Sequence, residues 1–419
     1  MGAAAGALSV YPILDLVKNE GFEQKLLESA DIGASTLAGD EDFWGWVKDA
    51  YTVSPNVINL NNGGVSPQPK VVQEALTRYN QLSNELPSYY MWEVLEKGRE
   101  NIRLDLSRLA GCSIDEISIN RNATEALNTV IFGLPLKAGD EVVLTKQDYP
   151  NMINAWKQRE KRDGIKLEWV NLEMPNEDDD KMVNAFESAF TSKTKILHLT
   201  HVINWNGQIL PVKKIIAAAH KRGIEVLVDG AHSFGQFEFN LKDLDCDYFG
   251  TSLHKWICAP FGSGMLFVKK EKIKKIWPLL SAPEPESEDI RKFEHLGTRS
   301  IPIEHAIGAA IAFHDMIGFE RKAARLRYLK NYWVNALTGT PGFKMQTSLK
   351  DQYSCGIAMF GIEGKKPGEV KQELFNKYSV HTVSIEWENI NGVRVSPNVY
   401  TSTRDLDKFI KGVSNIAHT

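Results

Sequence analysis

Ile224-Glu225-Val226-Leu227-Val228, followed directly by Asp229-Gly230-Ala231-His232, is the stretch that decides the fold of this chain. Its short apolar run predicts a strand buried on both faces, as in a parallel sheet. Tyr248-Phe249-Gly250-Thr251 predicts a second, weaker strand, and Ser252-Leu253-His254-Lys255 follows it. Open α/β sheets bind ligands at the carboxyl ends of their strands. The aspartate and the lysine are therefore expected to lie together at one sheet edge.

Short apolar runs alternate with helical patterns from about residue 56 to residue 268. The further strand candidates are Ile117-Ser118-Ile119, Glu141-Val142-Val143-Leu144, Ile196-Leu197-His198-Leu199 and Gly264-Met265-Leu266-Phe267-Val268. Between the last two, apolar residues recur at helical spacing from Val212 to Ala219, and Gly223 is a candidate αL terminator. This alternation predicts an α/β fold with a mostly parallel sheet and helices on both faces.

We expect three parts in the chain: an N-terminal extension (residues 1–55), a large domain (56–300) and a small C-terminal domain (301–419). The small domain should begin with a long helical stretch, about residues 303–337. Strands near 356–362 and 392–396, with helices near 367–378 and 403–416, then predict an α+β arrangement. The acidic run at 176–181 predicts a solvated loop.

Composition excludes several classes of partner. The 419 residues carry a net charge of −4, so no overall positive field would attract nucleic acid or an anionic membrane. The four cysteines are scattered, with neither metal-ligand spacing nor a dense disulfide framework. We therefore expect no metal site, no nucleic-acid or membrane partner, and a cytoplasmic setting.

The amino terminus leaves a second location open. Residues 2–10 are small and apolar, like the core of a secretory signal, but no basic segment precedes them and they are too short to span a bilayer. They are either the remnant of an export signal, in which case the protein is exported, or an ordinary tail.

A lysine and a carboxylate at one sheet edge suit pyridoxal 5′-phosphate, which needs a lysine for its Schiff base and an acid for its pyridine nitrogen. A phosphate site is expected where a helix follows the 117–119 strand. Asn122 could cap that helix, with Glu125 completing a capping box. The backbone N–H groups of Ala123 and Thr124 and the threonine hydroxyl could then hold a phosphate. The alternative is an ordinary capped helix.

Other enzyme classes lack their motifs. Gly262-Ser263-Gly264 has no third glycine and precedes a strand, which argues against a nicotinamide-dependent dehydrogenase. His198 and His201 do not form the His-Glu-x-x-His pattern of a zinc hydrolase. The Gly-x-Ser-x-Gly turn of many serine hydrolases is also absent from the sequence.

Four motifs in order carry a resemblance to a known family: Asn-Ala-Thr-Glu-Ala at 122–126, Asp-Tyr-Pro-Asn at 148–151, Asp-Gly-Ala-His at 229–232 and Ser-Leu-His-Lys at 252–255. From about residue 58 to residue 403 the chain resembles the class V aminotransferase branch of fold-type I pyridoxal-phosphate enzymes. This branch holds cysteine desulfurases, isopenicillin N epimerase and kynureninase-like proteins. The resemblance implies a seven-stranded, mostly parallel sheet in the large domain.

The resemblance also implies roles around the cofactor ring. Lys255 would form the Schiff base and later move the Cα proton, and Asp229 would keep the pyridine nitrogen protonated. Tyr149 would stack on the ring, which makes it the third candidate catalytic residue with Lys255 and Asp229. His232 would contact the ring oxygen, and Asn204 would reach the ring hydroxyl and the substrate carboxylate region.

The remaining implied contacts are to the phosphate and the substrate. Ser252 and His254 match family positions that bind the phosphate. Thr298, in Phe293-Glu294-His295-Leu296-Gly297-Thr298, matches a threonine that reaches the phosphate in the neighbouring subunit, so the resemblance implies a homodimer with shared active sites.

Arg394 matches the arginine that grips the substrate α-carboxylate with its planar fork. Alternation along the strand should place it on the opposite face from Val393 and Val395. Asn62 and Gly63, in Asn61-Asn62-Gly63-Gly64, match the segment that lines the substrate side, where glycine permits close approach of the backbone.

The resemblance leaves the reaction open. Cysteine desulfurases carry a loop cysteine shortly before the carboxylate arginine, and residues 379–392 contain none, although persulfide chemistry needs a thiolate. The Asn-Gly-Gly and Tyr-Pro pieces are more similar to the isopenicillin N epimerase subgroup. We expect an enzyme that acts on the Cα of an amino acid through an aldimine, first as a class V aminotransferase, second as an amino-acid or peptide epimerase, and third as a selenocysteine or cysteine lyase. The non-enzymatic alternative is a sensor module that binds the cofactor.

Overall fold

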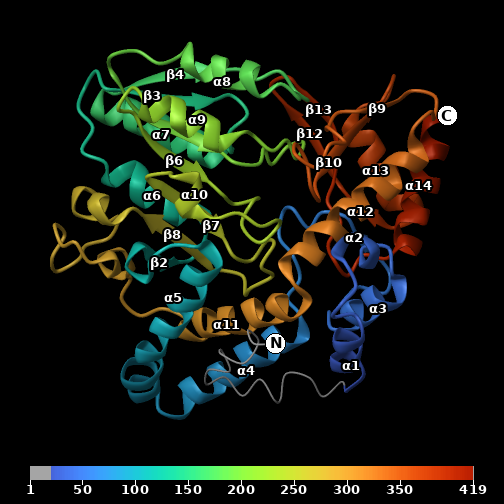
Figure 1. The fold of residues 1–419 in the computed structure, drawn as a ribbon, viewed down its shortest axis with the longest axis horizontal. Helices are drawn as coiled ribbons and strands as arrows, with labels where there is room; N and C mark the ends of the chain where they lie inside the picture. Colours follow the sequence, from blue (N-terminus) through green and yellow to red (C-terminus); the bar gives the residue numbers. More distant parts are fainter. Residues whose placement is uncertain (1–19, 419) are drawn as a thin grey trace.

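The computed structural model describes residues 20–418, so the expectation for residues 1–10 lies outside it. A seven-stranded sheet forms the large body on the left of Figure 1, in the order β2-β8-β7-β6-β5-β3-β4. Every strand is parallel except β8, which is antiparallel to both its neighbours. The strands are β2 (Ile117–Asn120), β3 (Glu141–Thr145), β4 (Lys166–Val170), β5 (Thr194–Thr200), β6 (Glu225–Asp229), β7 (Tyr248–Ser252) and β8 (Gly264–Val268).

The predicted mostly parallel sheet is confirmed, but its edge strand β4 was not among the predicted strands. Lys166 is exposed and Glu168 half-buried, while Leu167 and Val170 are buried. This half-polar pattern is typical of an edge strand and lacks the continuous apolar run of the central strands. A continuous apolar run therefore does not mark this strand in the sequence.

Helices cover both faces of the sheet because alternate strand residues face opposite cores. Val142, Leu144 and Leu227 pack with α6 and α7, whereas Val143 and Val228 belong to the core that includes α8 and α9. The helices of this body are α4 (Lys70–Glu85), α5 (Glu96–Ala110), α6 (Ala123–Gly133), α7 (Pro150–Asp163), α8 (Asp179–Glu187), α9 (Val212–His220), α10 (Leu241–Leu244) and α11 (Ile301–Ile317).

A second, four-stranded antiparallel sheet lies at the upper right of Figure 1, in the order β12-β13-β10-β9. Its strands are β9 (Phe343–Met345), β10 (Ala358–Ile362), β12 (Val383–Trp387) and β13 (Ile390–Val395). The helices around it are α12 (Phe319–Leu337), α13 (Pro367–Tyr378) and α14 (Thr403–Ala417). The predicted C-terminal α+β arrangement, with its two helices, is confirmed.

The helical stretch expected at 303–337 is two helices rather than one. Gly318, with φ of 91°, separates α11 from α12. Such a φ suits glycine, which has no Cβ. Helix α11 packs on α4 and α5 of the large body, whereas α12 contacts α14. The domain boundary expected between residues 300 and 301 stays a prediction.

The N-terminal segment and the short elements complete the fold. Helices α1 (Glu20–Glu28), α2 (Ala34–Leu37) and α3 (Glu41–Asp49) lie beside α12 and α14 (Figure 1). Strand β1 (Ile58–Asn59) pairs in parallel with β11 (Val380–His381). A π-helix spans Tyr89–Leu95, and 3₁₀ turns span Ile114–Glu116, Lys270–Lys275 and Ile290–Glu294.

Two smaller expectations can also be compared with the structure. The acidic run at 176–181 is a loop only in part, because Asp178 caps α8 by accepting from the Lys181 N–H at 3.0 Å, and α8 already begins at Asp179. Within residues 20–418, no helix combines the length and the apolar character that crossing a membrane would require.

Candidate active site

The carboxyl ends of β6 and β7 open into a cavity of about 350 Å³. Strand β6 ends at Asp229, and Lys255 follows the end of β7 by three residues. The cavity brings together most of the side chains predicted from the sequence. Its lining includes Gly63, Ala123, Thr124, Tyr149, Asn204, Asp229, His232, Ser252, His254, Lys255 and Arg394.

Lys255 is held as an amine of lowered basicity. Its Nζ lies 3.1 Å from Nε2 of His232. Burial lowers the pKa of Lys255 to about 8, against the opposing attraction of Asp229. Burial, together with the charges of Lys255 and Arg394, also lowers the pKa of His232 well below its usual value, so this imidazole is neutral. A neutral ring can accept a proton from the lysine or donate to an oxygen.

Asp229 is fixed from the sheet and from the turn that follows it. In the sheet it is paired with Thr200 on β5 and with Gly250 on β7. Its Oδ1 accepts from the Ala231 N–H at 2.9 Å. Burial raises the pKa of Asp229, and His198, the Ala231 N–H and Lys255 oppose the rise. A cationic group bound beside this buried carboxylate would stabilise its charged form.

The start of α6 lies against the end of β7 and has the kind of donors that bind an anion. Asn122 caps the helix by accepting from the Glu125 N–H at 2.9 Å, as expected. The Ala123 N–H was expected to be free, but it donates to the Ser252 Oγ at 2.9 Å. That bond leaves the Ser252 hydroxyl proton available to a phosphate, and within residues 20–418 the Thr124 N–H has no partner of its own.

The capping box expected here is wrong. The Glu125 carboxylate does not return to the cap residue. It accepts instead from the backbone N–H of Arg121 at 2.6 Å and from the Arg121 guanidinium. Strand β8 lies so close to the helix start that a Cβ on Gly264 would meet the Asn122 backbone at 2.6 Å. Glycine is therefore required at 264 for this approach.

Arg394 reaches the cavity from the small domain. It lies on the opposite face of β13 from Val393 and Val395, which belong to the small-domain core. The guanidinium donates to the Asn204 carbonyl and to Oδ1 of Asn61, both at 2.8 Å. Burial lowers its pKa to about 10. Arg394 is thus oriented by two acceptors, neither of which is a carboxylate, and its charge is available to an acidic group.

The substrate-side segment splits between cavity and core. Gly63 and Gly64 line the cavity, but Asn62 does not, because its side chain is fully buried and donates to the Ser396 carbonyl at 2.9 Å. The Tyr400 hydroxyl donates to it at 2.6 Å. Asn61, which the sequence analysis did not select, instead orients Arg394. Asn62 was expected to line the substrate side, but it is a core residue. Its neighbour Asn61 contacts the cavity residue Arg394.

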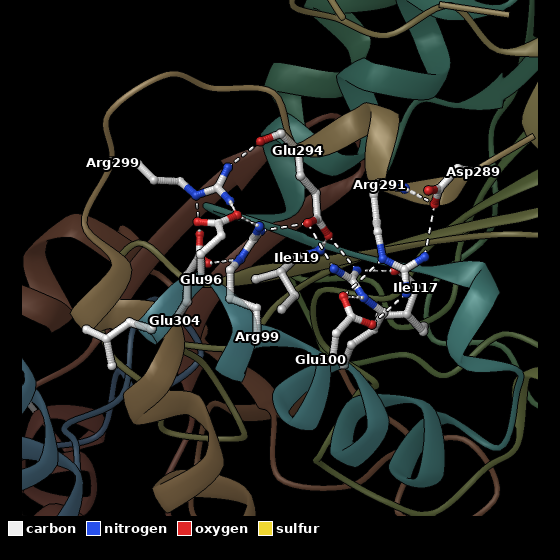
Figure 2. A network of polar contacts seen from close by, with 12 residues as sticks. Glu96, Arg99, Glu100, Ile117, Ile119, Asp289, Arg291, Glu294, Arg299 and Glu304 are labelled. Carbon is white, nitrogen blue, oxygen red and sulfur yellow. Dashed lines mark hydrogen bonds and ion pairs between the residues drawn. The ribbon is translucent and has the colours of Figure 1, made fainter. Parts of the chain in front are cut away.

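Thr298 lies outside this cavity, in an exposed loop. The loop is anchored by the ion-pair network in Figure 2, where Glu294 accepts from Arg99 at 2.6 Å and from Arg103 at 2.5 Å. Arg299 pairs with Glu304 at 2.8 Å and donates to the Glu294 carbonyl. A separate cavity of about 520 Å³ lies beside this network and shares no lining residue with the first. Thr298 therefore has no contact with the phosphate position of its own chain.

Several cavity residues were missed. Thr200 donates to the buried Asp148 at 2.6 Å, next to Tyr149 in the Asp-Tyr-Pro-Asn motif that could have indicated it. Met152, in the first turn of α7, also lines the cavity. Three others have no motif that could have revealed them: Trp205, Val383 and Ile385.

The cavity fits pyridoxal 5′-phosphate on its own polar atoms. Buried atoms without a partner include Oδ1 of Asn204, Nδ1 of His232 and Nδ1 of His254, all on residues that line the cavity. Buried polar atoms are normally hydrogen-bonded, so these point to a polar ligand. Tyr149 lines the cavity and is 41% exposed, and an aromatic side chain there suits contact with a planar ring.

Several known proteins are similar to this chain over most of its length. Isopenicillin N epimerase from Streptomyces clavuligerus is 28% identical over 87% of this chain and 96% of its own length. A probable cysteine desulfurase from Halalkalibacterium halodurans is 29% identical over 85% of this chain and 92% of its own length. Among solved structures, the apo cysteine desulfurase of Thermococcus onnurineus has a TM-score of 0.79 at 24% identity, covering 89% of this chain and 97% of that one.

The family assignment rests on the sequence as a whole. Residues 58–409 match the family described as Aminotransferase class-V, and this match covers all the cavity residues described above. Enzymes of this branch use pyridoxal 5′-phosphate, in agreement with the residues present. The chain belongs to the class V aminotransferase family and has its fold and its cofactor.

Proposed function

We propose that this protein is an enzyme that acts on the Cα of an amino acid, and that its reaction is a transamination. The observation that supports the proposal is the pairing of Lys255 with neutral His232 at 3.1 Å. Asp229 and Arg394 line the same cavity. When bound, pyridoxal phosphate supplies an electron sink for the Cα–H bond.

The cavity residues would bind the cofactor, bind the substrate and transfer the proton. Ser252, Thr124 and His254 would hold the phosphate, Asp229 the ring nitrogen, and His232 with Asn204 the ring oxygen. Arg394 binds the α-carboxylate of the substrate and so fixes the direction of the Cα–H bond. The Lys255 Nζ, with its pKa of about 8, accepts and returns a proton near neutral pH. One mobile amine would suffice for a transamination, because the same group could take the proton from the substrate Cα and return it to the aldehyde carbon of the cofactor, which is joined to Cα through the amino nitrogen.

Epimerisation is the second candidate, supported by the similarity to two proteins named isopenicillin N epimerase. It requires proton delivery to the other face of Cα. Tyr149 is the cavity residue that could supply it. Desulfuration has less support, because none of the cysteines in the described chain lines the cavity, and burial raises the pKa of Cys258 and Cys355.

A screen of amino acids in deuterated water distinguishes these reactions. We expect keto acid to form from the amino donor in the presence of a second keto acid, with the Lys255→Ala variant inactive. Deuterium at Cα with inversion and without consumption of keto acid would replace transamination by epimerisation. Release of sulfide or ammonia would indicate a lyase. If the holoenzyme binds amino acids and none of these products forms, the sensor alternative is correct.

We also propose a homodimer, in which Thr298 of one subunit lies at the phosphate of the other, and a cytoplasmic location. Exposure of Thr298 on an anchored loop supports the first proposal. The four free cysteines support the second. Sedimentation of the holoenzyme tests the dimer: a monomer at micromolar concentration would contradict it.

A further inference from the structure

An apolar stripe continues from the carboxylate-binding arginine along one face of the small-domain sheet. In β12, Val383, Ile385 and Trp387 alternate, so they share a face. Val383 is paired directly with Arg394 on β13, and side chains directly opposite in an antiparallel pair lie on the same face. Ile385 is paired with Gly392, which adds no side chain. The stripe therefore begins beside the guanidinium and runs away from it.

The far end of the stripe is closed by two stacked indoles. Trp387 packs on Trp205, with ring centroids 5.4 Å apart and planes at 26°. Trp205, Val383 and Ile385 all line the cavity. Trp387 does not line the cavity itself and acts on it by supporting the Trp205 ring. A substrate held by its carboxylate at Arg394 thus faces an apolar wall of Val383, Ile385 and Trp205.

The hairpin that carries this wall is fastened to the large domain. The Trp387 Nε1 donates to the Lys146 carbonyl at 2.8 Å, and the Asn389 side chain donates to the Leu172 carbonyl at 2.8 Å. Gln147 donates to Oδ1 of Asn389, also at 2.8 Å. These bonds fix the tip of the hairpin against the loops after β3 and β4. The wall is therefore a fixed part of the site, which suits a role in selecting the substrate.

The charged side chains of the cavity leave no partner for a charged substrate side chain. Of the lining residues in the described chain, the charged ones are Asp229, Lys255 and Arg394. The first two face the cofactor position, and Arg394 is taken by the α-carboxylate in the function proposed above. A charged substrate side chain would be desolvated against Ile385 and Trp205 without a partner, at a cost that favours neutral side chains.

We propose that the substrate is an α-amino acid with a large apolar or aromatic side chain, selected by Val383, Ile385 and the Trp205–Trp387 pair. This specificity rests on the proposed function, because it assumes that Arg394 binds the α-carboxylate. Burying an aromatic side chain against such a wall stabilises the complex by about 1.5–3 kcal/mol, or about 10- to 100-fold in affinity, relative to a small one.

The test is a titration of the holoenzyme with L-phenylalanine, L-alanine, L-aspartate and L-lysine, followed by the absorbance of the cofactor. We expect phenylalanine to bind about 10- to 100-fold more tightly than the other three. Trp205→Leu and Trp387→Ala should each weaken phenylalanine binding about 10-fold and leave alanine unchanged, while Trp387→Phe, which keeps a planar ring, should restore most of the loss. Trp277→Leu is the matched control, because Trp277 is 51% exposed.

The outcomes separate the two proposals. Equal binding of all four amino acids, or tighter binding of aspartate or lysine, overturns the specificity and leaves the function intact. An equal loss for phenylalanine and alanine in the tryptophan variants also overturns it, since the indoles would then only support the fold. If no amino acid changes the spectrum of a protein that holds the cofactor, both the proposed function and the specificity are wrong.

Discussion

The Lys255 side chain should titrate far below an ordinary lysine. Burial lowers its pKa to about 8, so the fraction of neutral amine rises with pH and reaches half near pH 8. Reductive methylation of the cofactor-free protein, read by mass spectrometry residue by residue, measures this rise. Lys377 is an internal control, because the hydrogen bond that it donates to Glu373 raises its pKa. The titration of Lys255 should lie more than two pH units below that of Lys377, and coincident curves for the two lysines would contradict the effect of burial.

The sequence predicted the position of a residue in the fold where that residue follows a short apolar run. Asp229 and Lys255 each follow such a run, and the sheet brings them to one edge. In the turn at 61–64 no periodicity exists, so the sequence could not show that Asn61 orients Arg394 while Asn62 is buried. The Trp205–Trp387 contact joins distant parts of the chain, and no local pattern predicts it.

At the scale of single elements, the start of α6 should recognise phosphate specifically. Ser252 accepts from the Ala123 N–H, which leaves its hydroxyl proton to donate. Removing one hydrogen bond to a charged group costs about 1.5–3 kcal/mol, or about 10- to 100-fold in affinity. Ser252→Ala should therefore weaken pyridoxal phosphate by that factor and leave pyridoxal, which lacks the phosphate, nearly unchanged.

Equilibrium dialysis of both ligands against the cofactor-free protein measures this difference. Ser188→Ala is the control, since the Ser188 hydroxyl is exposed and donates to the Asn184 carbonyl at the end of its own helix. An equal loss for pyridoxal and pyridoxal phosphate in Ser252→Ala would mean that the serine supports the fold of the site and not the phosphate.

Element prediction depended on how strongly local patterns differ from their surroundings. Helices α13 and α14 were predicted almost to the residue, because apolar spacing and flanking caps agree there. The β4 edge strand was missed because its pattern is half polar. The Glu125 cap was wrong because its carboxylate found a nearer partner in the Arg121 backbone N–H.

At the scale of the whole molecule, Glu294 joins α5, β2 and the loop that carries Thr298. Its carboxylate accepts from Arg99, Arg103 and the Ile119 N–H (Figure 2). Removing one partner of a buried ion pair costs about 3–5 kcal/mol, whereas an exposed pair contributes less than about 1 kcal/mol. Glu294→Gln should therefore lower the free energy of unfolding by about 3 kcal/mol, measured in urea. The matched control is Glu93→Gln, which breaks an exposed pair with Lys97.

The effect of Glu294 should also depend on pH. Burial raises the pKa of this carboxyl, but the hydrogen bond and charges of Arg103 and Arg99 outweigh it, so the pKa is lowered. A lowered pKa in the folded state contributes stability above the ordinary value near 4.5, and this stability is lost as pH falls through the folded value. The gap between wild type and Glu294→Gln should shrink in acid. A gap that grows in acid would contradict the ion-pair account.

Lys255 should carry the cofactor on its Nζ. Borohydride reduction of the holoenzyme, followed by digestion and mass spectrometry, fixes the cofactor to whichever lysine holds its aldehyde. We predict a single phosphopyridoxyl group, on the peptide that contains Ser252-Leu253-His254-Lys255, and its loss in Lys255→Ala. A label on any other lysine, or a protein that binds pyridoxal phosphate without acquiring a reducible bond, would contradict the account.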